Sequence, residues 1–120
     1  MADTMMDKYG RAKVRQVVSD FYGRVLESPR LSLYFDGVDI HTLVAHQSAF
    51  LEAVMGGLQG AGPDEIRRIH ARLDVPGADF EEMIDLLGHS LDRFEVEPVD
   101  KEAVQGRYLA YADQVVTNRG

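Results

Sequence analysis

The fold of this chain is indicated first by residues 43–57, which read Leu43-Val44-Ala45-His46-Gln47-Ser48-Ala49-Phe50-Leu51-Glu52-Ala53-Val54-Met55-Gly56-Gly57. Apolar residues recur there at helical spacing, and the two glycines end the helix. A second, shorter helix follows a glycine-rich break and ends in His70. Two helices joined in this way can face each other across a gap. His46 and His70 could therefore bind one metal centre from opposite sides.

The rest of the chain also predicts helices, because no stretch alternates apolar and polar residues for long and no Asn-Gly hairpin signal occurs. The first long helix is expected from Arg11 to Leu26, with one apolar stripe along it. Its members are Val14, Val17, Val18, Phe21, Tyr22 and Val25. Further helices are expected over residues 40–55, 78–94 and 100–116, with a short turn over 31–35. Asp39 is the expected N-cap of the helix that carries His46.

Length and composition limit the classes of function. The 120 residues fit one domain, residues 1–120, and the net charge of −7 argues against nucleic acid and anionic membranes as partners. Without cysteine, the chain has no disulfide, no zinc–thiolate site and no iron–sulfur cluster. The first residues have no basic start and no long apolar run, so we expect no signal peptide, no membrane span and a cytoplasmic location. We also expect a monomer.

The four histidines differ in what their positions predict. His41 lies in the first turn of its helix and His89 lies away from an apolar stripe, so both are expected at the surface. His70 ends a helix of about two turns, and periodicity alone leaves open whether it is a ligand or a partly exposed structural residue. His46 lies at the edge of a buried stripe. Gln47 occupies an inward position, where a buried amide needs a partner or a ligand.

Tyr22 and Phe35 also allow two interpretations. Tyr22 belongs to the apolar stripe of its helix, and a tyrosine there is usually a core residue whose hydroxyl is hydrogen-bonded. Phe35 ends the short turn and is expected in the core as well. Each of these signals is weak alone. Their order and spacing along the chain carry more information than any one of them.

That order resembles the group I truncated haemoglobins, the two-over-two helical globins. Residues 17–26 with their Phe21-Tyr22 pair are similar to the first core helix of that family. Residues 31–39 resemble the following turn, and residues 45–51 with Gly56-Gly57 resemble the distal helix and its double-glycine end. His70 and Leu73 resemble the proximal helix, and residues 80–96 the next long helix. The match spans roughly residues 7 to 116.

The resemblance implies an all-α truncated globin fold that holds haem b, with His70 as the proximal iron ligand. Tyr22 and Gln47 would donate hydrogen bonds to bound O2, and Leu43 would face that ligand from one helical turn before Gln47. His46 matches the position that supplies a sixth iron ligand in cyanobacterial members when no gas is bound. The remaining cofactor contacts implied are Phe35, Phe50, Arg67 and Leu73, with Arg67 and Arg68 near the propionates.

The sequence departs from the family pattern at three places. The Tyr-x-Gly-Arg element that usually precedes the proximal helix is replaced by Gly60-Ala61-Gly62-Pro63. The first glycine pair is reduced to Gly10-Arg11. The C-terminal tail has no histidine, so the covalent histidine–haem link of some cyanobacterial members cannot form at the equivalent site.

Three functions remain open at this point. The first is a haem b protein for O2, NO or CO, with uses such as oxygen transport, which is six-coordinate through His46 and His70 when no gas is bound. The second is an enzyme, a nitric-oxide dioxygenase or a weak peroxidase, which would need an external electron-donor reductase because 120 residues leave no room for a flavin domain. The third is an acidic helical interaction module in which the histidines are incidental.

Overall fold

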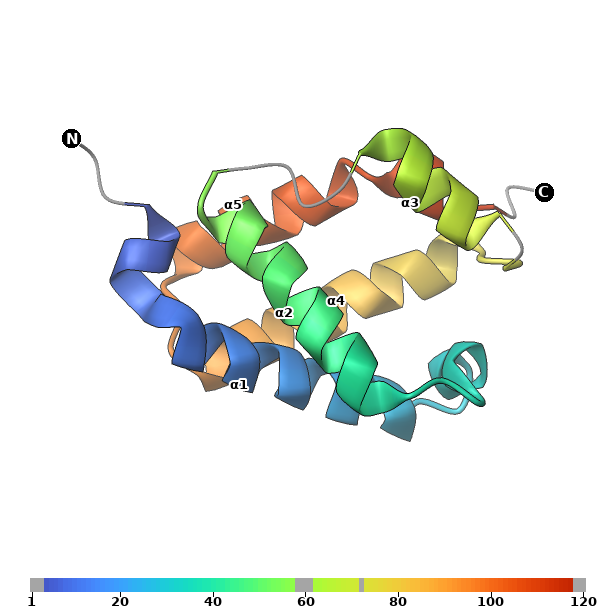
Figure 1. Cartoon of the computed structure of the whole chain (residues 1–120), viewed down its shortest axis with the longest axis horizontal. Coiled ribbons are helices and arrows are strands. Elements are labelled where there is room, and N and C mark those ends of the chain that lie inside the picture. The colour runs from blue at the N-terminus through green and yellow to red at the C-terminus, as the bar shows by residue number, and fades with distance from the viewer. Residues whose placement is uncertain (1–3, 58–61, 72, 118–120) are drawn as a thin grey trace.

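A computed structural model of the chain describes residues 4–57, 62–71 and 73–117, and they form helices joined by short connections (Figure 1). The elements are α1 (Met5–Glu27), the 3-10 helix η1 (Leu31–Phe35), α2 (Ile40–Met55), α3 (Pro63–His70), α4 (Gly77–Arg93), α5 (Pro98–Leu109) and α6 (Ala112–Val115). The all-α class predicted from the sequence is confirmed.

The long helices form two pairs. Helix α1 packs against α2 and α4, and α5 packs against α4, so α1 with α2 makes one pair and α4 with α5 makes the other (Figure 1). The short α3 packs against α6 rather than against the long helices. This is the two-over-two arrangement that the sequence predicted. Among the described residues, no helix is long and apolar enough to cross a membrane.

The apolar stripe predicted for α1 is confirmed, since all six of its members are buried in the core. The first helix was expected to begin at Arg11, whereas α1 begins at Met5 and is interrupted at Gly10. The φ of Gly10 is 81°, which a regular helix cannot accommodate. The turn before Gly10 was not predicted from the periodicity. It is stabilised by a capping box, in which Thr4 and Asp7 bond to each other's backbone N–H groups.

Helix α2 has the predicted bounds. The Asp39 side chain accepts a hydrogen bond from the backbone N–H of Thr42 at 3.4 Å, as expected of an N-cap. Gly56 is the C-cap and Gly57 follows with a φ of 82°. Leu51 and Val54 from the predicted stripe are buried, and the same helix also buries Ser48 and Met55. The predicted glycine-rich break, a loop over residues 58–63, falls mostly on residues 58–61, which lie outside the described residues.

The prediction of one C-terminal helix over residues 100–116 is wrong, because the chain ends α5 at Leu109 and begins α6 at Ala112. Tertiary hydrogen bonds explain the break. The Val75 backbone N–H donates to Thr117 Oγ1 at 2.8 Å, and the Thr117 N–H donates to the Val75 carbonyl at 3.0 Å. These two bonds hold Thr117 beside the connection between α3 and α4.

Candidate functional site

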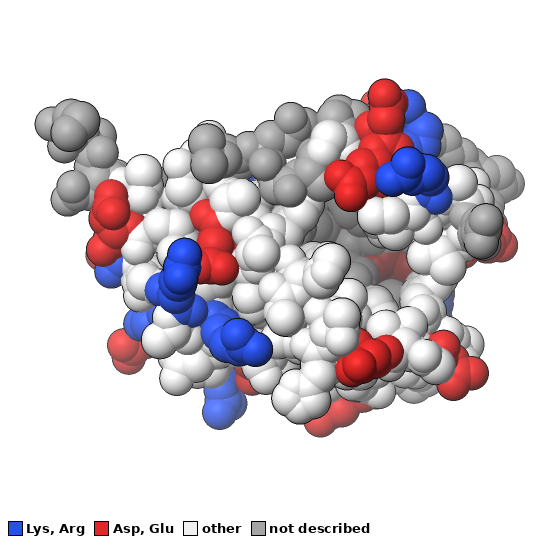
Figure 2. Space-filling view, viewed as in Figure 1, with Lys and Arg blue, Asp and Glu red and all other residues white. Residues whose placement is uncertain are grey.

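A cavity of about 320 Å³ lies between the helix pairs, and residues from α1 to α6 and from η1 line it. Most of its lining is apolar, and its size is within the range of small-molecule and cofactor sites. The space-filling surface is hollowed beside α3 (Figure 2). Ile69 of α3 lines the cavity and is nevertheless 59% exposed, which places it where the cavity opens to solvent.

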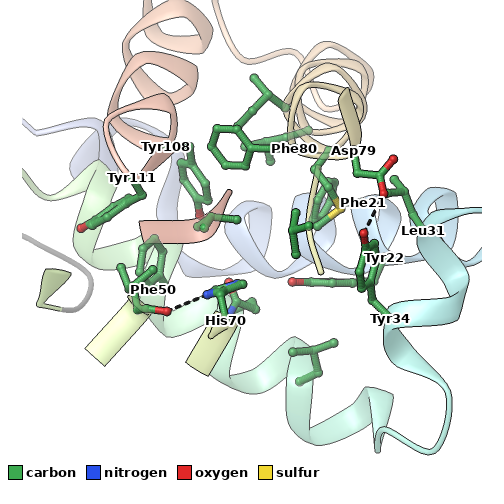
Figure 3. Close-up of a pocket in the computed structure, with 18 of the residues that line it drawn as sticks. Phe21, Tyr22, Leu31, Tyr34, Phe50, His70, Asp79, Phe80, Tyr108 and Tyr111 are labelled. Carbon is green, nitrogen blue, oxygen red and sulfur yellow. Dashed lines mark hydrogen bonds between the residues drawn. The ribbon is translucent and has the colours of Figure 1, made fainter. Parts of the chain in front are cut away.

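His70 reaches this cavity from the last position of α3 (Figure 3). Its Nδ1 atom lies 2.8 Å from the carbonyl oxygen of Ile66, one turn earlier. Because a carbonyl oxygen can only accept, Nδ1 carries the proton in this bond. In the neutral ring the Nε2 atom then keeps its lone pair, which is the arrangement that metal-binding histidines need.

Tyr22 faces the same cavity from α1 (Figure 3). Its side chain is only 5% exposed, and burial raises the pKa of its hydroxyl, so the phenol is protonated at neutral pH. None of the described residues forms a hydrogen bond with this hydroxyl. A hydroxyl that faces a cavity without a protein partner is free to donate a hydrogen bond to a bound molecule.

Helix α2 contributes three of the predicted residues to the cavity wall, Leu43, Gln47 and Phe50. Their spacing of four and three residues places them on one face of the helix. Gln47 is half-buried there, so its amide is a second polar group that a bound molecule can reach. Phe35 of η1 and Leu73 also line the cavity.

Aromatic rings form much of the remaining wall. The rings of Tyr22 and Phe35 pack edge to face with centroids 5.6 Å apart, and those of Phe50 and Tyr108 with centroids 5.4 Å apart. Tyr108 and Tyr111 also line the cavity. Helical spacing can indicate that such residues point inward, but it does not distinguish packed core from cavity wall.

Two predicted site residues lie elsewhere in this structure. His46 is exposed and is not part of the cavity lining, because it precedes Gln47 by one residue and so projects about 100° away around α2. Arg67 is also exposed and forms an ion pair with Asp64 at 3.3 Å, outside the cavity. His41 and His89 lie at the surface, as expected.

Asp79 and Tyr34 also line the cavity, and no sequence pattern assigns either of them a function. Asp79 lies in the first turn of α4, where an acidic residue usually indicates no more than a favourable interaction with the helix dipole. Its carboxylate is 5% exposed and accepts a hydrogen bond from the Tyr34 hydroxyl at 2.6 Å (Figure 3). The pairing spans 45 residues, so local sequence could not reveal it.

Comparisons with known proteins identify a family and a curated relative that this chain is similar to. Residues 4–117 match the family described as bacterial-like globin. Over 93 residues the chain is 28% identical to the group 1 truncated hemoglobin LI410 of Chlamydomonas moewusii, which covers 76% of this chain and 54% of the relative. The chain therefore spans about half the length of that curated relative.

Three solved structures share the fold. The 2/2 hemoglobin of Synechococcus sp. PCC 7002, which has covalently attached heme, superposes with a TM-score of 0.85 at 22% identity, covering 97% of this chain and 100% of the other. THB4 of Chlamydomonas reinhardtii gives 0.81 at 25% identity, covering 93% and 94%. The Fe(III) form of truncated hemoglobin from Tetrahymena pyriformis gives 0.84 at 19% identity, covering 95% and 98%.

Proposed function

Because this chain belongs to the bacterial-like globin family, we propose that it is a haem b protein that reversibly binds a diatomic gas, O2, NO or CO, at one iron. The observation that carries the proposal is the setting of His70. The Ile66 carbonyl holds its Nδ1 proton, and the side chain lines an apolar cavity from one side. A single oriented imidazole beside an apolar cavity is what axial ligation of haem requires.

The residues present fit haem in three respects. His70 Nε2 has a free lone pair for the iron, and the hydrogen bond to Ile66 makes the imidazole a better electron donor. Phe35 and Phe50 offer flat aromatic contacts, and the apolar lining keeps water from the site. When bound, haem supplies an iron atom to which a gas molecule binds.

Tyr22 and Gln47 are proposed to hold the bound gas. Both line the cavity, and the unpartnered phenol of Tyr22 is protonated at neutral pH because burial raises its pKa. A hydrogen-bond donor in a low-dielectric cavity stabilises a gas molecule that carries partial negative charge more than it would in water. Leu43 lies on the same face of α2 as Gln47 and contributes an apolar side chain to that wall.

Reconstitution tests this function. Haemin added to the metal-free protein should give a saturating Soret band at one equivalent, and CO should shift that band after reduction. The variant His89→Ala serves as a control, because His89 is exposed on α4 and does not line the cavity. The absence of a Soret band in the wild-type protein would contradict the proposal and favour the interaction-module alternative.

We propose in addition that His46 binds the iron from the opposite side when no gas is present. The position of His46, one residue before the cavity-lining Gln47, supports this proposal. Since the side chain is exposed in this structure, ligation requires α2 to turn by up to about 100° around its axis, and gas binding then competes with closure. A low-spin ferric and ferrous spectrum that becomes high-spin in His46→Ala is expected. A high-spin wild-type spectrum at neutral pH would remove His46 from the iron.

The enzymatic alternative, nitric-oxide dioxygenation, would use the same two donors, Tyr22 and Gln47. It would also require an electron donor from outside the described chain. Stopped-flow mixing of the O2-saturated ferrous protein with NO separates the two functions. Fast and complete conversion to nitrate favours the enzyme, whereas slow and incomplete oxidation favours a gas-binding protein.

A further inference from the structure

One wall of the cavity contains a charged group that the proposed function does not use. Asp79 lies across the cavity from His70 (Figure 3). Its Oδ2 atom accepts the hydrogen bond from the Tyr34 hydroxyl at 2.6 Å, and Arg30 forms an ion pair with Oδ1. We call Arg30, Tyr34 and Asp79 the Asp79 cluster. The Tyr34 hydroxyl also lies 3.1 Å from the Asp74 carbonyl oxygen, so it touches the connection between α3 and α4.

The hydrogen bond from Tyr34 is the best-formed contact of the Asp79 carboxylate. A buried carboxylate is costly unless it is paired, and Arg30, its ionic partner, is itself largely exposed. Among the described residues, Oδ1 accepts no hydrogen bond of good geometry. Burial and the neighbouring Asp79 carboxylate raise the pKa of Tyr34 to about 12, so its hydroxyl remains a donor at neutral pH.

The cluster joins two segments that are far apart in the sequence. Tyr34 belongs to η1, and Asp79 belongs to the first turn of α4. The next residue of η1, Phe35, lines the cavity and packs edge to face against Tyr22. A bond that fixes Tyr34 therefore also fixes the aromatic ring that would lie against the haem.

We propose that Asp79 is a positioning residue, which fastens η1 to α4 through Tyr34 and thereby slows the release of haem from the cavity. This inference rests on the proposed function. Folding itself has a separate anchor in η1, because the Leu31 side chain is fully buried in the core. Loss of the Tyr34–Asp79 bond should therefore affect the cavity wall, and with it the rate of haem release, more than the free energy of unfolding.

A second bond to α4 provides a matched control. The Ser28 hydroxyl donates to Glu82 Oε2 at 2.8 Å, close in sequence to the Asp79 cluster but without a residue on the cavity wall. The variants Tyr34→Phe, Asp79→Asn and Glu82→Gln would each be loaded with haemin and mixed with excess apomyoglobin, which captures released haem. We expect release to be about tenfold faster in Tyr34→Phe and Asp79→Asn, since a hydrogen bond to a charged group is lost. Release from Glu82→Gln should match the wild type.

An ultraviolet titration of the haem-free protein provides the second readout. The difference between wild type and Tyr34→Phe isolates the ionisation of Tyr34, whose pKa should fall from about 12 in Asp79→Asn. Should Asp79→Asn fail to fold, Tyr34→Phe, which removes one oxygen atom, still carries the test. Equal release rates in wild type and Tyr34→Phe would overturn the inference, as would equal acceleration in Glu82→Gln. A wild-type protein without a Soret band would instead overturn the proposed function.

Discussion

Helix α3 and the two long helices α1 and α4, called the scaffold below, are built very differently. The scaffold buries a continuous apolar core, and α1 begins with a capping box. Helix α3 has eight residues and no side-chain cap, and Ile66 is its one buried side chain among those described. His70, the proposed axial ligand, thus lies in the less firmly anchored of the two regions. The stability of the fold lies in the scaffold, whereas haem itself should supply part of the stability of α3.

The largest effect is expected from damage to the scaffold. Leu91→Ala removes a side chain that is fully buried on α4 and does not line the cavity. Urea unfolding of the haem-free protein should show a loss of about 2–5 kcal/mol, from lost burial and the space left behind. The folded fraction should still give the wild-type Soret band. If Leu91→Ala left the free energy of unfolding unchanged, the claim that the scaffold supplies the stability of the fold would be contradicted.

A smaller effect is expected in the cavity. Tyr22→Phe removes the hydroxyl that faces the cavity and leaves the buried ring in place. O2 should dissociate about ten- to a hundredfold faster in flash photolysis, because a hydrogen bond to a partly charged ligand is worth roughly 1.5–3 kcal/mol. CO dissociation is the internal control, since bound CO carries little charge. Equal O2 rates in both proteins would show that this hydroxyl does not reach the gas.

Asp20 connects the two scaffold helices and gives a pH-dependent prediction. Burial acts to raise its pKa, but hydrogen bonds from Arg24 at 2.7 Å and Ser90 at 2.8 Å outweigh it, so its pKa lies below 3.8. A lowered pKa means that the carboxylate stabilises the fold above pH 3.8 and loses this effect as pH falls through the folded value.

We expect Asp20→Asn to lower the free energy of unfolding by about 1–2 kcal/mol at pH 7, the range for one lost charged hydrogen bond in a partly buried site. The difference from wild type should shrink in urea titrations carried out below pH 3.8. A difference that stays constant well below pH 3.8 would assign the effect to packing rather than to charge.

The smallest effect should come from α3 itself. Gly62 is its N-cap, with φ −70° and ψ 150°, and space is open where a Cβ would lie. Gly62→Ser should stabilise the helix by a few tenths of a kcal/mol, about the gain for a serine over a glycine cap. Hydrogen exchange of α3 amides in the haem-free protein should slow by about twofold, while exchange in α1 stays unchanged. Faster exchange in α3 would contradict the prediction.

The regular parts of the fold could be predicted from the sequence because their causes are local. The bounds of α2 follow from Asp39 and Gly56, and the buried stripe of α1 follows from helical spacing. The break before Ala112 could not be predicted, since it depends on hydrogen bonds between Val75 and Thr117. Spacing alone does not reveal such distant pairing.

The candidate site shows the same limit. The resemblance placed Tyr22, Gln47 and His70 in one site, and the structure brings these three to one cavity. The resemblance placed His46 there as well. In the structure His46 is exposed, because one residue along a helix changes the direction of a side chain by about 100°. Asp79 was missed because the sequence cannot show that a carboxylate in a first helical turn is buried against a distant tyrosine.

The most direct test of the central claim, that α3 presents His70 as the axial ligand of haem, is a haemin titration of wild type and His70→Ala with and without added imidazole. We predict saturation of the wild type at one equivalent, a loss of affinity of more than about a hundredfold in the variant, and recovery of the wild-type spectrum when imidazole replaces the missing side chain. A His70→Ala protein that binds haemin with unchanged affinity and an unchanged spectrum would contradict the claim.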